Sequence, residues 1–413
     1  MASYCRAASP GAGGSPTHSG VLPAEPGRTS LQRYKSIGLH RALLTLIVFW
    51  LVGTLQPLYA QGNGKLQIHF MDVGQGDGAV LISPKGEVVL FDDGVLNNCD
   101  KPIAYLQQLG VTAIDYHITS HYHADHIGCA AQVLQQFPLR KLAYDRGQSY
   151  ASSSFTSYIA TVTDAKRRTA VAGTEFALDS GSSQVTIRFV ALNGNGVVTN
   201  NENDLSLVSV VEFGGFRAEF GGDLSGEKTG NYEDIETDVA PKVGRIDVYK
   251  VHHHCSSHSS NEAWLGVIKP RIGIISAGDG NTYGHPAQDC LDRLHAAGIK
   301  TYWTEHGNGG TPTAPYDVVA GSVFVEVAPG ASTYRVTTTD GNADTYPIWA
   351  SSPAMPPGPS PAVPTPSGSF AWSKLAKYYH YSTCSYVASI SPANLERGSS
   401  PPPDKQLHHN CPR

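Results

Sequence analysis

One run of six residues limits the possible folds more than any other feature of the sequence. Residues 121–126 read His-Tyr-His-Ala-Asp-His and directly follow an apolar segment that is typical of a buried strand. In an extended loop, side chains two residues apart point the same way. His121 and His123 can therefore bind one cation while Asp125 and His126 face a second. The alternative is a solvated histidine-rich loop.

Two other predicted strands are also followed by residues that bind metals. Residues 252–256 read His-His-His-Cys-Ser, and Asp223 follows the apolar segment 216–220. Strands that end at one rim can present ligands to a shared site, and an acid there can bridge two cations. An ordinary turn aspartate is the alternative for Asp223.

Short apolar segments alternate with helical ones between Leu66 and Pro347. Strands are predicted at 66–70, 79–82, 88–91, 114–119, 185–190, 205–213, 216–220, 246–251 and 272–276. Helices are predicted at 102–110, 130–137 and 288–297, with another that begins at a capping box of Ser259 and Glu262 and ends before Pro270. Runs of strands with interspersed helices indicate two β-sheets covered by helices, not a doubly wound parallel sheet.

The composition divides the chain into four segments. Residues 1–60 form an N-terminal extension and signal peptide, 61–350 the main domain, 351–369 a proline-rich linker, and 370–413 a small C-terminal module. Basic residues precede a short apolar run, and cleavage is expected after Ala60. The protein is then secreted or periplasmic, with no stable membrane span. A retained N-terminal anchor is the alternative.

The charge balance indicates that the overall electrostatic field of the protein does not attract polyanions. The formal net charge is −5, and it becomes −9 without residues 1–60, which contain five Lys or Arg and one Glu. A polyanionic substrate therefore needs a local patch or a metal. The run 166–168 (Lys-Arg-Arg) is more typical of a solvated face than of a phosphate site.

The C-terminal module is too small for a large core and needs a staple or a metal to fold alone. His380 and Cys384 have a His-x3-Cys spacing, and Cys411 lies near the chain end. This pattern is similar to a small His/Cys module of some secreted hydrolases and is compatible with zinc. A Cys384–Cys411 disulfide explains the cysteines equally well. Attachment to a cell surface is a candidate role for the module.

Several motifs together carry a resemblance to a known family. The matching motifs, in chain order, lie at residues 72–77 (Asp-Val-Gly-Gln-Gly-Asp), 92–94, 121–126, 203–206, 222–223, 253–256 and 283–286. The run 121–126 matches the HxHxDH signature of the metallo-β-lactamase superfamily. The whole series, over roughly residues 66–310, resembles the exported metallo-β-lactamase domain of ComEC-type competence proteins, in a free-standing form without the membrane channel.

This resemblance implies an αββα sandwich with a binuclear site at one edge of the sheets. His121 and His123 then hold one ion, Asp125 and His126 hold the other, and Asp223 bridges them. Of the following histidine pair, similarity to secreted phosphorylcholine esterases of the superfamily favours His254 as the last ligand. His253 then faces the substrate.

Two departures from the family pattern carry expectations of their own. No histidine lies between Ile127 and Gly222 to complete the first metal site, and Asp204 or Asn203 is the candidate to approach it. Cys129 and Cys255 replace glycines on two loops expected to meet at the metal centre. We expect a Cys129–Cys255 disulfide, with two unrelated thiols as the alternative.

The expected function is a secreted hydrolase that cleaves phosphodiesters, in DNA or in phosphocholine-type esters, with a metal-bridging hydroxide. Two divalent ions are required, zinc first and manganese as the alternative. The candidate catalytic residues are Asp125, His253 and His285, with a protonated His253 or His285 stabilising negative charge. A structural turn role is the alternative for His285.

Asp92 is expected to hydrogen-bond a ligand histidine, and Asp204 is the second candidate for such a supporting role. The competing functions are a hydrolase of lactones or β-lactams and a non-catalytic surface protein that uses the same fold for binding.

Overall fold

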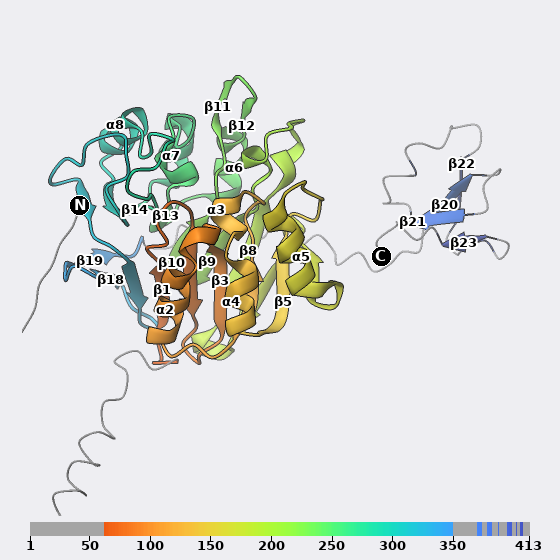
Figure 1. The fold of residues 1–413 in the computed structure, drawn as a ribbon, viewed down its shortest axis with the longest axis horizontal. Coiled ribbons are helices and arrows are strands. Elements are labelled where there is room, and N and C mark those ends of the chain that lie inside the picture. Colours follow the sequence, from red (N-terminus) through yellow and green to blue (C-terminus); the bar gives the residue numbers. More distant parts are fainter. Residues whose placement is uncertain are drawn as a thin grey trace, which may run out of the picture. The chain divides into compact units, whose positions relative to one another are not determined.

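A computed structural model describes residues 62–349 and, in the C-terminal part, residues 370–373, 378–381, 387, 395–398, 402 and 405–407 (Figure 1). The expected signal peptide, the proline-rich linker, Cys384 and Cys411 lie outside the described residues. None of the described helices is both long enough and apolar enough to cross a membrane.

The first sheet has nine strands in the order β19-β18-β17-β1-β2-β3-β4-β5-β6. Its strands are β1 (Leu66–Phe70), β2 (Gly78–Ile82), β3 (Val88–Asp93), β4 (Ile114–Ile118), β5 (Leu139–Asp145), β6 (Arg167–Thr169), β17 (Val323–Val327), β18 (Thr333–Thr338) and β19 (Ala343–Pro347). Strands β3 to β6 run parallel, and the others pair antiparallel.

The second sheet has eight strands in the order β16-β15-β14-β13-β10-β9-β8-β7. They are β7 (Glu175–Leu178), β8 (Val185–Ala191), β9 (Val208–Phe213), β10 (Phe216–Phe220), β13 (Val248–Lys250), β14 (Ile272–Ile275), β15 (Lys300–Trp303) and β16 (Asp317–Val319). Strands β10 and β13 to β16 run parallel. A separate hairpin pairs β11 (Gly226–Thr229) with β12 (Tyr232–Asp234).

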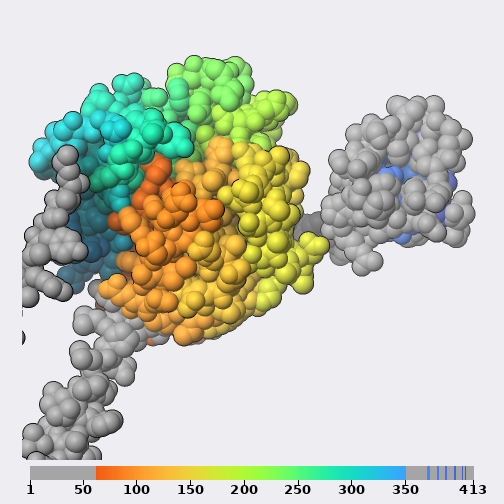
Figure 2. Space-filling view, viewed as in Figure 1, coloured from red at the N-terminus to blue at the C-terminus, as the bar shows by residue number. Residues whose placement is uncertain are grey.

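Three apolar clusters define four layers. One cluster joins the facing sides of the two sheets and includes Phe70 of β1 and Phe220 of β10, whose rings stack 5.5 Å apart. A second packs helices on the outer face of the first sheet, and a third does the same on the second sheet. The fold is thus helix, sheet, sheet, helix, which confirms the expected αββα sandwich. Figure 2 shows its earlier part, orange to yellow, packed against the green to cyan part.

Helices α2 (Asp100–Gln108), α4 (Ala130–Gln136) and α5 (Ser153–Lys166) cover the first sheet, and α6 (Glu236–Val243), α7 (Glu262–Ile268) and α8 (Gln288–Ala296) cover the second. A short helix, α3 (Ala124–Ile127), carries two of the candidate ligands. The strands and helices expected from the sequence are all present, with ends shifted by a few residues. The N-cap of α7 differs from the prediction. The side chain of Asn261, not that of Ser259, accepts the Trp264 N–H at the start of this helix.

The C-terminal part forms a four-stranded sheet in the order β22-β20-β21-β23. The strands are β20 (Phe370–Ser373), β21 (Tyr378–Tyr381), β22 (Leu395–Gly398) and β23 (Gln406–Leu407). Ala371 and Val387 are buried together in it, with Leu395 packed against them.

Candidate metal centre

All the candidate ligands lie just beyond the carboxyl ends of parallel strands. His121, His123 and Asp125 follow β4 of the first sheet, while Asp223 follows β10 and His254 follows β13 of the second. The carboxyl ends of parallel strands meet at one edge of a sheet, so the two sheets bring these loops to one rim. The topology thus explains why ligands as far apart in sequence as His121 and His254 meet.

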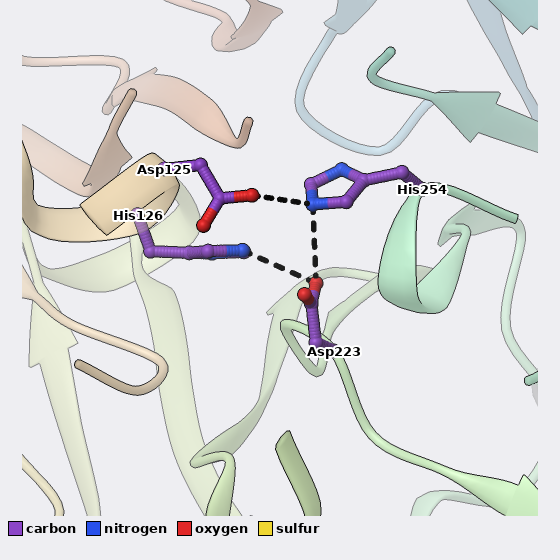
Figure 3. Close-up of side chains that lie close together, drawn as sticks. All are labelled: Asp125, His126, Asp223 and His254. Carbon is purple, nitrogen blue, oxygen red and sulfur yellow. Dashed lines mark ion pairs between the residues drawn. The ribbon is translucent and has the colours of Figure 1, made fainter. Parts of the chain in front are cut away.

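The ligands predicted from the sequence fall into two groups that share one carboxylate. The first group is Asp125, His126, Asp223 and His254, and the second is His121, His123 and Asp223, with the candidate ligand atoms of each group within 4.8 Å of one another. Figure 3 shows the first group pointing toward a common centre. The side chains come together as the resemblance implied.

The two oxygens of Asp223 face different groups. Oδ1 lies 3.2 Å from Nε2 of His126 and 3.5 Å from Nε2 of His254. Oδ2 lies 3.9 Å from Nε2 of His121 and 3.8 Å from Nε2 of His253. A carboxylate placed in this way is suited to bridge two cations.

Some ligand atoms of the first group lack a hydrogen-bond partner, and they show whether a cation would fit there. Nε2 of His126, Nε2 of His254 and Oδ1 of Asp223 are buried and have no hydrogen-bond partner among the described residues. Buried polar atoms are ordinarily satisfied, so three that converge on one point call for a ligand. Imidazole nitrogens with carboxylate oxygens are a donor set typical of zinc and other transition metals. The residues therefore fit a divalent cation.

Hydrogen bonds on the far side of each imidazole fix its orientation. Nδ1 of His126 donates to Oδ2 of Asp92 at 2.8 Å, and Nδ1 of His254 donates to the carbonyl oxygen of Ser276 at 2.8 Å. Both rings then present Nε2 to the centre, which is the tautomer that a metal ligand needs. Asp92 also accepts from the backbone N–H and the hydroxyl of Ser120. This is the supporting role expected for Asp92.

The histidine loop has an unusual backbone. His253, His254 and Cys255 have φ angles of 50°, 52° and 62°, in the left-handed region. Three successive non-glycine residues there are costly and persist only when the surroundings enforce them. One such constraint is the N–H of His253, which donates to the carbonyl of Gly222 next to Asp223. The turn thereby points His254 inward and places His253 beside Asn203, 3.3 Å away.

Neighbouring charges set the protonation of the first group. Burial alone would lower the pKa of His126 and of His254, but Asp223 and the other nearby carboxylates raise both well above the usual value. Burial would raise the pKa of Asp223, but His126, His254 and His253 hold it well below its usual range. The cluster therefore carries protons on the sites where a cation would bind, and metal binding would release them.

His253 and His285 behave differently. Burial lowers the pKa of His253 to about 4 and that of His285 to about 3, so both rings are neutral at pH 7. Their centroids lie 5.3 Å apart. Burial therefore disfavours the protonated form expected of His253 or His285, because desolvation outweighs the attraction of Asp223 and Asp125. Each ring offers a neutral N–H donor.

Asp204 does not approach the ligand groups. Its Oδ2 accepts from the hydroxyl of Thr199 and from the N–H of Glu233, and burial raises its pKa. The expected supporting role of Asp204 is therefore not found, since its carboxylate ties two loops together instead. The neighbouring Asn203 is the residue that contacts the site, through His253.

The expected Cys129–Cys255 disulfide is wrong. Cys129 is bonded to Cys99, and Cys255 is bonded to Cys290. The two loops do meet at the centre, but each cysteine bonds to a partner on its own outer layer. Cys99 directly precedes α2, and Cys290 lies in α8.

Three residues at the site were missed by sequence reasoning. Asp77 lies 3.2 Å from Nδ1 of His254, Lys250 lies 2.7 Å from Asp77, and Ser120 binds Asp92. Asp77 is the last residue of the matching motif 72–77, but the motif alone predicts no contact with the ligand histidines. Its position next to a strand start was the available signal. No local pattern marks Lys250 or Ser120.

The comparisons with known proteins agree with this geometry. Residues 78–278 match the family model of the metallo-beta-lactamase superfamily, a range that contains every ligand of both groups. This part of the chain is a metallo-beta-lactamase superfamily domain, and the expected family is confirmed.

Relatives of the expected type were also found. The chain is 28% identical to ComE operon protein 3 of Bacillus subtilis (strain 168), over 60% of this chain and 33% of that protein. It is 28% identical to Recombination protein 2 of Haemophilus influenzae, over 55% and 26%, and 27% identical to Competence protein ComA of Neisseria gonorrhoeae, over 57% and 30%. The chain thus spans about a third or less of the length of these relatives.

Among solved structures, a metallo-beta-lactamase of Cronobacter sakazakii aligns with a TM-score of 0.31 and 18% identity, over 46% of this chain and 75% of that one.

Proposed function

We propose that this protein is an exported, binuclear metal-dependent hydrolase that cleaves phosphodiester bonds, in DNA or in phosphocholine-type esters. The proposal depends on one observation: the two carboxylate oxygens of Asp223 face two separate groups of ligands. Two divalent cations held there would activate water and neutralise charge on phosphoryl oxygens. Zinc suits the donor set best, and manganese is the alternative.

The residues of the chain supply orientation and hydrogen bonds. Asp92 and the carbonyl of Ser276 hold His126 and His254 with Nε2 toward the centre. The rings of His253 and His285, whose pKa values burial lowers, can each donate an N–H to a phosphoryl oxygen in the neutral form. Asp125, whose side chain is 23% exposed, is the most solvent-accessible member of the group that it forms with His126, Asp223 and His254.

An aromatic side chain beside the site favours a substrate with a flat or cationic group. Tyr283 is 68% exposed, and its ring is stacked 5.8 Å from that of His285. Such a face can stack on a nucleobase or contact a quaternary ammonium. Relatives named for competence and recombination favour the nucleic-acid alternative.

Export is proposed on two grounds. The run before Gln61 has the pattern of a signal peptide, and the structure holds two disulfides, which persist in oxidising compartments.

Metal content and turnover of bis-p-nitrophenyl phosphate test the proposed function. We expect two equivalents of metal per chain and hydrolysis that chelation abolishes. His123→Ala should lower kcat/KM by at least about 100-fold, since loss of even an outer partner of a ligand costs 10–100-fold. The matched control is His258→Ala, a partly exposed histidine paired with Glu227 outside both groups, which should leave turnover unchanged. Metal-replete protein that leaves phosphodiesters intact but opens a lactone or a β-lactam would contradict the proposal.

A further inference from the structure

Lys250 is a buried cation that the proposed chemistry does not use. Its side chain is 4% exposed, and Nζ lies 2.7 Å from Oδ1 of Asp77 and 3.0 Å from the carbonyl oxygen of Val251. A lysine is rarely buried unless it is paired, because desolvating the ammonium is costly. Lys250 ends β13, only four residues before His254, so its placement is coupled to the histidine loop.

Asp77, the partner of Lys250, touches three members of one ligand group. Its Oδ1 lies 3.2 Å from Nδ1 of His254, its Oδ2 lies 3.9 Å from Nδ1 of His126, and its N–H donates to the carbonyl of Asp125 at 3.1 Å. The approach needs glycine before it, since a Cβ on Gly76 would lie 2.1 Å from that same carbonyl.

The other ligand group has no such contact. No hydrogen bond or ion pair joins Asp77 or Lys250 to His121 or His123 within the described part of the chain. Asp77 also belongs to a third set of possible ligands with Asp92 and His126, but there the ammonium of Lys250 already balances the carboxylate. The ion pair is therefore selective for one of the two groups that share Asp223.

We infer that the Lys250–Asp77 ion pair is a positioning element for one cation only, the one held by Asp125, His126, Asp223 and His254. Ser276 and Asp92 accept the Nδ1–H groups of His254 and His126, and the Asp77 carboxylate lies beside the same two atoms and supports that orientation. Lys250 holds Asp77 in this place. The two cation sites are consequently unequal in what supports them. This inference rests on the binuclear centre proposed above.

Cobalt(II) titration of the metal-free full chain, followed by visible absorption and calorimetry, separates the two sites. Wild type should bind two equivalents. Lys250→Met and Asp77→Leu should each weaken one equivalent by about 10–100-fold and leave the other unchanged. Arginine is not a useful replacement at 250, because the adjoining cavity, lined by Asp77, Asp92 and Ser120 among others, has a volume of only about 20 Å³.

A double variant distinguishes positioning from a merely structural role. Each single variant leaves a buried charge unpaired and should lower thermal stability, whereas Lys250→Met with Asp77→Leu removes both charges and should regain it. Positioning predicts that the double variant still binds one cobalt weakly. If its affinity recovers together with its stability, or if both equivalents weaken equally in the single variants, the inference is overturned.

Lys300→Met with Asp344→Leu is the matched control. This pair, 2.9 Å apart, is partly exposed and lies outside both ligand groups, so both cobalt affinities should stay at the wild-type value. A loss of affinity in the control would show that any lysine–aspartate replacement disturbs the centre, and would overturn the inference. Wild type that binds no cobalt would instead overturn the proposed function itself.

Discussion

At the scale of single residues, His252 shows how the loop that carries His254 is anchored from behind. Its ring is fully buried between two buried glutamates, with Nδ1 2.7 Å from Glu236 and Nε2 3.1 Å from Glu219. Glu236 also accepts the N–H groups of Ser260 and Asn261, which follow the loop. The three consecutive histidines thus have three different roles. His252 anchors the loop, His253 lies beside the ligand groups, and His254 points into the centre.

His252→Gln should destabilise the protein and change its response to alkaline pH. Burial would lower the pKa of His252, but Glu219 and Glu236 raise it to about 9. A histidine whose pKa is raised on folding stabilises fully below its unfolded value of about 6.5, and the contribution disappears as the pH rises through 9. At pH 7 the variant should lose about 3–5 kcal/mol in free energy of unfolding.

Urea denaturation of the metal-free protein at pH 7 and pH 10 measures both effects. The difference between wild type and His252→Gln should shrink at pH 10, where wild type has lost the charge. His295→Gln, at a partly exposed pair with Asp317, is the control and should cost much less. An equal difference at the two pH values would contradict the assigned charge of His252.

The ligands themselves could be predicted from sequence, but their supports could not. His121, His123, Asp125 and His126 are local neighbours after a strand, so residue type and spacing suffice. Asp77, by contrast, meets Asp125 only because two loops approach within hydrogen-bond distance in three dimensions. The supporting role predicted for Asp204 was not found for the same reason. Its position in the motif does not reveal that Thr199 and Glu233 donate to its carboxylate.

At the scale of elements, each ligand loop is fastened to the helical layer on its own side. The Cys99–Cys129 bond joins the residue before α2 to the residue before α4, and the Cys255–Cys290 bond joins the histidine turn to α8. The family resemblance correctly predicted that Cys129 and Cys255 lie close to the centre. It could not give their pairing, because Cys99 and Cys290 lie in elements whose packing sequence patterns do not specify.

Removing the Cys255–Cys290 bond should weaken cation binding as well as stability. The bond closes a loop over a sequence separation of 35 residues, and its loss should cost about 3–4 kcal/mol of unfolding free energy. Because Cys255 adjoins His254 in a strained turn, Cys255→Ser with Cys290→Ser should also weaken one cobalt equivalent.

Cys99→Ser with Cys129→Ser is the comparison, with a sequence separation of 30 residues and a similar expected cost in stability. Its effect should fall on the His126 side of the centre, because Cys129 lies three residues beyond His126. Unchanged cobalt affinity in both double variants, measured by calorimetry, would show that the disulfides stabilise the fold without ordering the site.

At the scale of the whole molecule, Asp247 joins the two sheets. Its carboxylate accepts the N–H of Arg217 on β10 and the N–H of Trp349 beyond β19, and its carbonyl accepts the hydroxyl of Tyr334 on β18. The architecture itself was predictable, since strand runs with helices between them admit few layer arrangements. The hydrogen bonds through which Asp247 connects the two sheets could not be predicted. They depend on strands β18 and β19, and no apolar run in the sequence indicated these strands.

Asp247 should make the protein less stable as the pH rises through the mildly acidic range. Burial raises its pKa to about 6, against the opposing backbone hydrogen bonds and the charges of Arg271 and Arg217. For an acid whose folded pKa lies above its unfolded value of about 3.9, the folded state binds the proton more tightly. Stability then falls between pH 4 and pH 7, by up to about 3 kcal/mol.

Asp247→Asn isolates this contribution. The variant keeps a similar shape without the charge, so its stability should depend less steeply on pH than that of wild type when both are unfolded by urea at pH 4.5 and pH 7. Parallel pH dependence of the two proteins would rule out a raised pKa at Asp247.

The sharing of Asp223 between two ligand groups has a consequence for biogenesis. A nascent chain that has emerged only as far as residue 126 carries four potential ligands but lacks the carboxylate that joins them, and His254 emerges later still. If the centre binds cations, its complete ligand set exists only once the loops that carry Asp223 and His254 have joined the fold, so we expect cations to bind after the two sheets have packed.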